Sequence, residues 1–224
     1  DVELVLVGAA VTRFAACRDA LAMAGRLERG SVRGKFEIEA VEHLLPGADG
    51  AANGISGGDA ASDTIQGFPA GQLMSPQSAP VDHLTLKLLT PLRLHGASRE
   101  APTFHALMRS LLRRAAALAS FDPAVGAQDE AETAALLGLA KGVQARESAL
   151  TWFDWERASP SKGEWMKLGG YVGSLGFAGE MAPFVPYLRL GEWVHVGGKT
   201  SFGLGKYRSV ISRGAAHGDI DHQA

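Results

Sequence analysis

The predicted elements alternate between strands and helices in an order that places the chain in the α+β class. The first forty residues give β-α-β, an order that fits an α/β or an α+β layer. From residue 84 to residue 211 the order is β-α-β-β-α-β, which is the ferredoxin-like pattern. The 224 residues, 46% of them hydrophobic and 21% charged, exclude a mostly disordered chain and allow one large domain or two small ones.

The first unit is predicted from three short patterns. Residues 2–7 form a continuous apolar run that predicts a buried strand, and residues 12–26 have helical spacing. Residues 35–42 alternate apolar and charged side chains, which predicts a half-buried strand. The next 35 residues, 46–80, carry seven Gly and four Pro, which predicts a flexible connection with a short hairpin near residues 65–68.

The second unit opens with a strand over residues 84–94 that is predicted to bend at Thr90-Pro91. The strongest helix is expected at residues 102–121, because apolar residues recur on one stripe over four turns. Further along we expect a weaker helix at 129–145, strands at 152–155 and 171–177 with a turn at 160–163, a short helix at 181–190 capped near Gly191, a loop at 196–205 and a last strand at 206–211.

The charge distribution favours an anionic partner although the formal net charge is only −2. Residues 83–121 hold six basic residues against one acid, and residues 187–213 hold five against one. Local patches of this kind set the affinity for phosphates, although a solvated charged face gives the same pattern. No apolar run reaches the roughly 18 residues of a membrane span. The single cysteine, Cys17, makes a reducing cytoplasm the expected compartment.

A glycine-rich segment, VGGKTSFGLGKY at 196–207, is the most distinctive local motif. Such a loop brings backbone N–H groups and the charges of Lys199 and Lys206 close to phosphates. It is not a Walker A loop, because Trp193 stands where that motif needs Gly, and it lacks the third Gly of a dinucleotide fingerprint. The alternative is a tight helix-to-strand connection whose glycines adopt left-handed dihedrals.

A strip of basic side chains lies beside the apolar stripe of the helix at 102–121. His105, Arg109 and Arg113 follow one another at intervals of four residues, so they share one helical face. A neutral imidazole can accept a proton while arginines hold phosphate charge, a combination suited to phosphodiester chemistry. An exposed basic helix face explains the same spacing.

The other histidines and the aromatic cluster are less specific. His195 adjoins the glycine-rich segment, where it contacts RNA or fills space. The spacing of histidines and the single cysteine matches no metal-site motif, so neither a metal nor another cofactor is expected. The aromatic residues Trp152, Phe153, Trp155 and Trp165 are expected to pack in the core, although stacking on bases is an alternative.

Several of these motifs together resemble a known family. They are the strand LTLKLLTPLRL (84–94), the helix with Arg113-Arg114, the segment WFDWER (152–157), the run GGYVGSLGF (169–177) and GEWVHVGGKTSFGLGKY (191–207). In this order they resemble the CRISPR precursor-RNA processing endoribonuclease, the sixth Cas family of the RAMP superfamily. Residues 2–8 and 30–41 resemble the later half of that family's first domain.

The resemblance implies two tandem ferredoxin-like domains. Residues 1–45 are then the later half of the first domain, 46–80 a Gly/Pro-rich linker or insertion, 81–213 the second domain with the glycine-rich loop, and 214–224 a flexible tail. The chain starts at Asp1 without Met, and we expect that an N-terminal part of the first domain is missing.

The resemblance further implies binding of CRISPR repeat RNA, interaction with other Cas proteins, and metal-independent cleavage in which a 2′-OH attacks the adjacent phosphate to leave a 2′,3′-cyclic phosphate. His105 is the predicted catalytic base. The expected RNA-binding residues are Arg109, Arg113, Gly197, Gly198, Lys199, Gly203, Gly205, Lys206 and Arg208. The alternative is a non-catalytic RAMP subunit that binds guide RNA in an effector complex.

Overall fold

The computed structural model describes residues 2–26, 35–47, 52–58, 62–94, 101–121, 129–158 and 165–212. The predicted turn at 160–163 and the predicted tail at 214–224 lie outside these ranges. No helix in the described ranges is long and apolar enough to cross a membrane.

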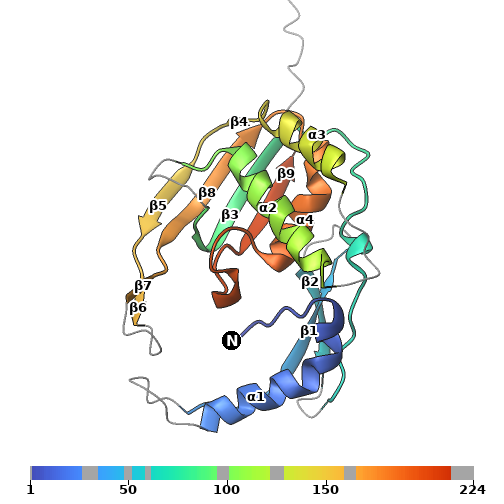
Figure 1. The fold of residues 1–224 in the computed structure, drawn as a ribbon, viewed down its shortest axis with the longest axis vertical. Helices are drawn as coiled ribbons and strands as arrows, with labels where there is room; N and C mark the ends of the chain where they lie inside the picture. Colours follow the sequence, from blue (N-terminus) through green and yellow to red (C-terminus); the bar gives the residue numbers. More distant parts are fainter. Residues whose placement is uncertain are drawn as a thin grey trace, which may run out of the picture.

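An antiparallel sheet forms the centre of the larger part of the molecule (Figure 1). Its order is β4-β8-β3-β9, with β5 also paired to β8. The strands are β3 (His83–Leu92), β4 (Gln144–Ala145), β5 (Ala149–Phe153), β8 (Gly170–Ala178) and β9 (Tyr207–Ser212). With β3 and β8 in the middle and the last strand beside β3, this is the ferredoxin-like order, so the predicted α+β fold class is confirmed.

Helices cover one face of this sheet (Figure 1), and the side chains of β3 that alternate along the strand, Leu84, Leu86 and Leu88, are buried under them. They are α2 (Phe104–Ala119), α3 (Glu130–Ala140), and α4 (Val185–Val194), which follows the short 3-10 helix η3 (Ala182–Phe184). Thr103 begins α2 by accepting a hydrogen bond from the Ala106 N–H at 3.2 Å. Asp129 caps α3 in the same way, through the Ala131 N–H at 2.8 Å.

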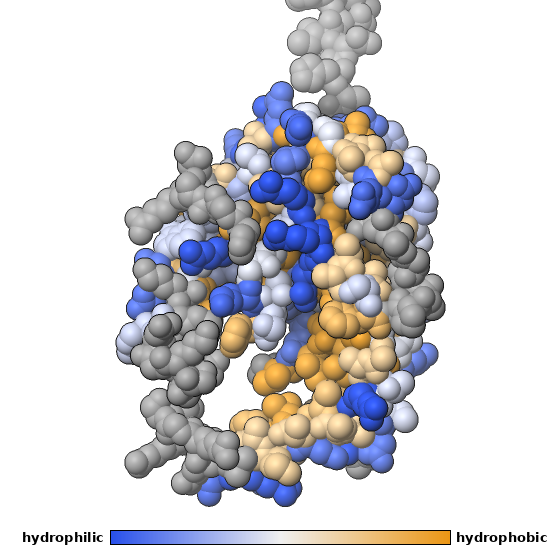
Figure 2. Space-filling model, viewed as in Figure 1, coloured by the Kyte–Doolittle hydropathy of each residue, from blue (hydrophilic) through white to orange (hydrophobic). Residues whose placement is uncertain are grey.

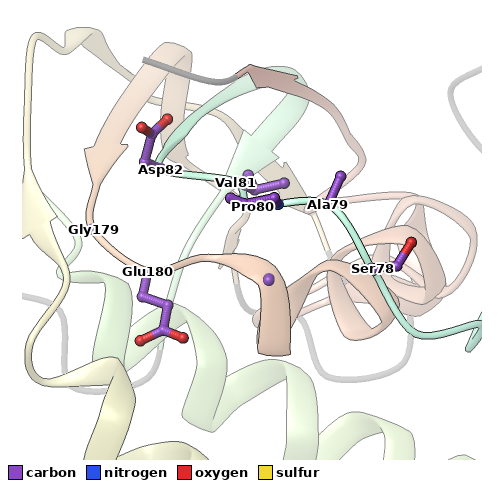
Figure 3. A pocket seen from close by; sticks show the side chains of 8 residues that line it. Ser78, Ala79, Pro80, Val81, Asp82, Gly179 and Glu180 are labelled. Atoms are coloured by element: carbon purple, nitrogen blue, oxygen red, sulfur yellow. The ribbon is translucent and has the colours of Figure 1, made fainter. Parts of the chain in front are cut away.

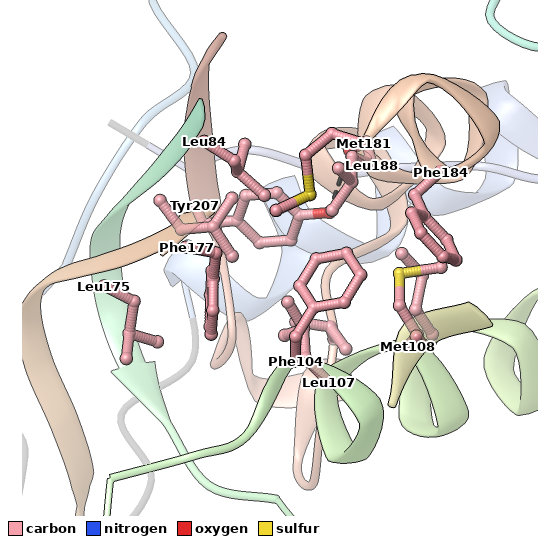
Figure 4. Close-up of a cluster of buried hydrophobic side chains, with 14 of the residues drawn as sticks. Leu84, Phe104, Leu107, Met108, Leu175, Phe177, Met181, Phe184, Leu188 and Tyr207 are labelled. Carbon is pink, nitrogen blue, oxygen red and sulfur yellow. Dashed lines mark hydrogen bonds between the residues drawn. The ribbon is translucent and has the colours of Figure 1, made fainter. Parts of the chain in front are cut away.

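Large apolar side chains from both layers fill the core (Figure 4). Phe104 of α2 lies edge-on to Phe177 of β8, with ring centroids 5.2 Å apart, and edge-on to Phe184 at 5.0 Å. This arrangement suits the aromatic quadrupoles and fixes the start of α2 against the sheet. The opposite end of α2 is held by Arg114, whose Nε donates to the Val194 carbonyl at 2.6 Å.

Tyr207 is a fully buried phenol at the start of β9. Its hydroxyl donates to the Leu188 carbonyl of α4 at 2.8 Å (Figure 4). Burial, with a smaller contribution from Glu192, raises the pKa of Tyr207 well above its usual value.

We therefore expect the free energy of unfolding to fall as the pH rises above about 10, because the unfolded tyrosine ionises there and the folded one does not. Urea denaturation of the wild type and of Tyr207→Phe between pH 8 and 11 measures this dependence. Tyr187→Phe is the matched control, since Tyr187 is less buried and its pKa is raised less. Equal pH slopes for the wild type and Tyr207→Phe would contradict the prediction.

The first part of the chain differs from its prediction at two strands. Residues 2–7 are not a strand, because no described strand lies beside them, and most of their apolar side chains are exposed. The strand predicted at 35–42 instead starts at Val41, where its partner ends, so that β1 (Val41–Pro46) pairs with β2 (Ala52–Gly58). The predicted helix is confirmed as α1 (Phe14–Arg26), preceded by the 3-10 helix η1 (Gly8–Arg13).

The segment predicted as a flexible connection contains regular structure. Besides β2 it contains the 3-10 helix η2 (Ala70–Gln72), whereas residues 65–68, the predicted hairpin, form no strand. Phe68 lies edge-on to Trp193 of α4 with ring centroids 4.9 Å apart, and Leu73 is buried beside the same tryptophan. This second apolar cluster attaches the segment to the ferredoxin-like unit. The domain boundaries at residues 45, 80 and 213 stay predictions.

Two further expectations for the helices of the second unit are corrected. α4 continues through Gly191 to Val194, because this glycine serves close packing rather than capping: a Cβ there would overlap the Tyr207 hydroxyl. The weaker helix, α3, ends at Ala140, after which the short strand β4 begins.

The aromatic cluster is not all core. Trp152 packs edge-on against Tyr171 at 5.0 Å, as expected. Phe153, Trp155 and Trp165 are exposed instead, because Phe153 points away from the helices and the other two lie at the hairpin of β6 (Glu156–Ala158) and β7 (Trp165–Lys167), beyond the edge of the core.

Candidate functional site

The glycine-rich loop connects the end of α4 to β9 and is tied to the end of β3. The Gly198 N–H donates to the Arg93 carbonyl at 2.8 Å and the Gly205 N–H to the Pro91 carbonyl at 3.0 Å. Val196 and Gly205 close the loop on itself, with N–H to carbonyl at 3.0 Å. Left-handed φ angles occur at Gly197, Lys199, Gly203 and Gly205. These glycines therefore form a tight connection from helix to strand with left-handed dihedrals, which was the alternative interpretation of the motif.

The predicted bend at Thr90-Pro91 holds the loop in place. The pairing of β3 with β8 shifts register between Leu88 and Leu92, so that Thr90 has no partner on β8. Its hydroxyl donates to the Gly203 carbonyl at 2.8 Å and accepts from the Lys206 N–H at 2.8 Å. The bend thus fixes both the exit of the loop and the position of Lys206.

The loop keeps donors available for an anion. Within the described residues, the N–H groups of Gly197, Lys199, Thr200 and Ser201 make no hydrogen bond. Lys199 is exposed at the left-handed start of the short 3-10 helix η4 (Thr200–Phe202). Unpaired N–H groups beside an ammonium charge are suited to phosphate oxygens.

A second group of charges lies where α2, α4 and the loop meet. His195 adopts a positive φ of 62° directly after α4, and its N–H donates to the Gly191 carbonyl at 2.9 Å. Burial lowers the pKa of His195; the charges of Lys206 and Arg114 lower it further, while Glu3 raises it. Burial also lowers the pKa of Arg114. The ammonium of Lys206 pairs with the Glu3 carboxylate.

The predicted basic strip is present on α2. Arg109 and Arg113 are exposed and His105 is half-buried, while the residues between them face the core. Figure 2 shows hydrophilic residues gathered along α2 in the middle of this face of the molecule. The strip and the loop do not meet at His105: this histidine lies nine residues before Arg114, about 14 Å along the helix axis.

Arg208 is the predicted RNA contact that is most engaged with the protein. It lies on β9 opposite Lys87, and its guanidinium is 3.3 Å from the buried Glu192 carboxylate. The same carboxylate accepts from the Ser209 N–H at 2.8 Å and from the Ser209 hydroxyl. Arg208 therefore has a structural role in joining α4 to β9, and its RNA contact stays a prediction.

The sequence did not single out Glu3, Thr90 and Arg114 as site residues. Arg114 could have been noted as the neighbour of Arg113, but it points to the other side of the helix, toward Val194. No pattern in the sequence could have indicated the role of Glu3, because nearly two hundred residues separate it from the loop. In the described residues no three His, Cys, Asp or Glu side chains converge in a way that would hold a metal ion.

A pocket of about 460 Å³ lies at the other end of β3 (Figure 3). It is lined by Ser78, Ala79, Pro80, Val81, Asp82, Gly179, Glu180 and Ala182. Its two carboxylates, Asp82 and Glu180, point away from each other in Figure 3. A ten-residue strand separates it from the glycine-rich loop by about 30 Å, and its acidic lining is unsuited to phosphate.

Fold and loop together define a class: a ferredoxin-like unit with a basic helix and a glycine-rich loop immediately before its last strand. Within this class, residues 86–207 match the family described as CRISPR-associated endoribonuclease Cas6. The chain belongs to this family, and the resemblance stated from the sequence is confirmed. No curated protein sequence matches the chain.

The first of three similar solved structures shows the same fold. A Cas6 product complex has a TM-score of 0.50 at 17% identity, over 64% of this chain and 56% of that one. Thermus thermophilus Cas6 has a TM-score of 0.47 at 18% identity, over 64% and 58%. A partial Cas6-RT-Cas1–Cas2 complex has a TM-score of 0.42 at 21% identity, over 62% and 24%. The chain thus spans less than two thirds of the length of each of these proteins.

Proposed function

We propose that this chain binds CRISPR repeat RNA and takes part in its endonucleolytic cleavage to mature CRISPR RNAs. The observation that carries the proposal is the glycine-rich loop, with its unpaired N–H groups and Lys199 and Lys206, at one end of the basic strip of α2. The membership of this chain in the Cas6 family supports the proposal. Other Cas proteins are the further partners that this family membership suggests.

We infer that the RNA strand runs from the loop along α2. Each step of four residues advances about 6 Å along the helix, similar to the separation of successive phosphates in an extended strand. Arg113 and Arg109 would then hold consecutive phosphates, and His105 would lie beside the next one. On this path the RNA bridges the distance of about 14 Å that separates His105 from Arg114 along the helix axis.

The proposed chemistry needs no metal ion. The neutral imidazole of His105 accepts the 2′-OH proton, and the oxygen attacks the adjacent phosphorus. The P–O5′ bond breaks, which leaves a 2′,3′-cyclic phosphate on one product, and O5′ takes up a proton to become the 5′-OH of the other. Arg109 stabilises the charge that develops on the phosphate.

The test uses the full-length protein with its own labelled repeat RNA in EDTA, analysed on a denaturing gel. We expect one cut at a fixed position that a 2′-deoxy substitution immediately before it abolishes. Tight binding without a cut would favour the non-catalytic RAMP subunit, the alternative that the distance between His105 and the loop favours. Absence of RNA binding would contradict the proposal.

A double substitution, Lys199→Ala with Lys206→Ala, should weaken RNA binding and lower its salt dependence. Each phosphate contact releases about one counterion, so the slope of log K against log salt should fall by about two. Filter binding between 50 and 300 mM salt measures this slope. The matched control is Lys141→Ala with Arg146→Ala, which removes the same charge near α3. Equal slopes for the two double variants would remove the loop from the RNA site.

A further inference from the structure

Three nitrogen-bearing side chains from separate elements converge beneath the glycine-rich loop. Arg114 comes from the last turns of α2, His195 directly follows α4, and Lys206 directly precedes β9. Arg114 and Lys206 are close enough to act electrostatically on the imidazole of His195. This group of three, the loop-base cluster, lies apart from the His105 end of α2.

One nitrogen of the cluster is buried without a partner. His195 Nε2 is shielded from solvent and makes no hydrogen bond within the described residues. Burial lowers the pKa of the imidazole and so favours the neutral ring, although the backbone of Leu204 raises it. In the tautomer that carries its proton on Nδ1, Nε2 has a lone pair that faces no donor in that part of the chain.

The two cations of the cluster still have binding capacity. Arg114 uses Nε for the Val194 carbonyl, and its two terminal nitrogens make no hydrogen bond within the described residues. Lys206 is paired only with the Glu3 carboxylate in that part of the chain. Glu3 belongs to residues 2–7, which are in neither helix nor strand, so little besides this ion pair fixes its carboxylate.

We propose that the loop-base cluster is a ribonucleotide subsite, in which His195 Nε2 accepts a hydrogen bond from a ribose 2′-OH and Arg114 and Lys206 hold the neighbouring phosphate. The Glu3 carboxylate occupies the phosphate position in the RNA-free protein and lies close enough to act on the imidazole. Its displacement on binding is the step that opens the buried Nε2 to the ribose. This inference rests on the proposed function and adds the residues that distinguish RNA from DNA. A 2′-OH supplies the donor that Nε2 lacks, and DNA does not.

The closing experiment is a binding cycle with the full-length protein and its repeat RNA. Single 2′-deoxy substitutions are scanned along the repeat, and Kd is measured for the wild type, His195→Leu and His195→Gln. In the wild type we expect one 2′-deoxy position to weaken binding about five- to tenfold. In His195→Leu the same position should cost nothing further, while His195→Gln, which retains an acceptor, should keep part of the discrimination.

The proposal that the Glu3 carboxylate occupies the phosphate position is tested in the same assay with Glu3→Gln. Removing the competing carboxylate should lower Kd about two- to fivefold at low salt, because the RNA no longer has to displace a charge. Two results would overturn the inference. One is that the 2′-deoxy substitution weakens the binding of His195→Leu by the same factor as it weakens that of the wild type, and the other is that Glu3→Gln leaves Kd unchanged. These outcomes differ from failure of the proposed function, in which the wild type itself would bind no repeat RNA.

Discussion

Replacement of His105 by Ala is expected to lower the rate of RNA cleavage by about 10²- to 10⁴-fold, the usual contribution of a general base. RNA affinity should change little, because Arg109, Arg113 and the glycine-rich loop remain. Stability should also be kept, since His105 is half-buried on a helix face and Ala favours helices. Single-turnover cleavage and filter binding on the same preparation separate these quantities.

The matched control for His105 is His83→Ala. His83 is paired with Asp82 at 3.0 Å and lies on the face of the sheet that the helices leave uncovered. Its loss should leave both cleavage and binding unchanged. Cleavage at the wild-type rate by His105→Ala would assign the catalytic base to another residue, while the family membership would stand.

Replacement of Gly205 by Ala is expected to destabilise the fold by about 3 kcal/mol and to weaken RNA binding more than tenfold. The residue has a φ of +75°, and a Cβ there would overlap the carbonyl oxygen of Val196, the residue that closes the loop. The loop would have to open, which would displace both Lys206 and the unpaired N–H groups. Urea denaturation and filter binding measure the two effects.

Gly203→Ala provides an unusually close comparison. Its φ of +78° is almost the same, but a Cβ at Gly203 would meet nothing within 4 Å. Only the cost of the left-handed conformation remains, about 1 kcal/mol. If both variants lost the same stability, the contact between Gly205 and Val196 would not be what holds the loop.

Local patterns carried much of the fold prediction. The stripe of α2, the alternation in β3 and the start of β9 were all found within one or two residues, because each depends on periodicity that neighbouring residues reveal. Strands whose existence depends on a partner were harder to predict. Residues 2–7 are as apolar as a strand, but no described strand lies beside them, whereas β2 has a glycine-rich sequence and pairs with β1.

The fold class, the family and the glycine-rich loop could be predicted from the sequence, because they follow from the order of elements and from contiguous motifs. The arrangement of the charges became visible in the folded protein. It placed His105 more than two helical turns from Arg114, engaged Arg208 with the buried Glu192, and brought Glu3, Arg114 and Lys206 around His195. These contacts join residues far apart in the chain, and such distances are set by packing of layers, which no local pattern encodes.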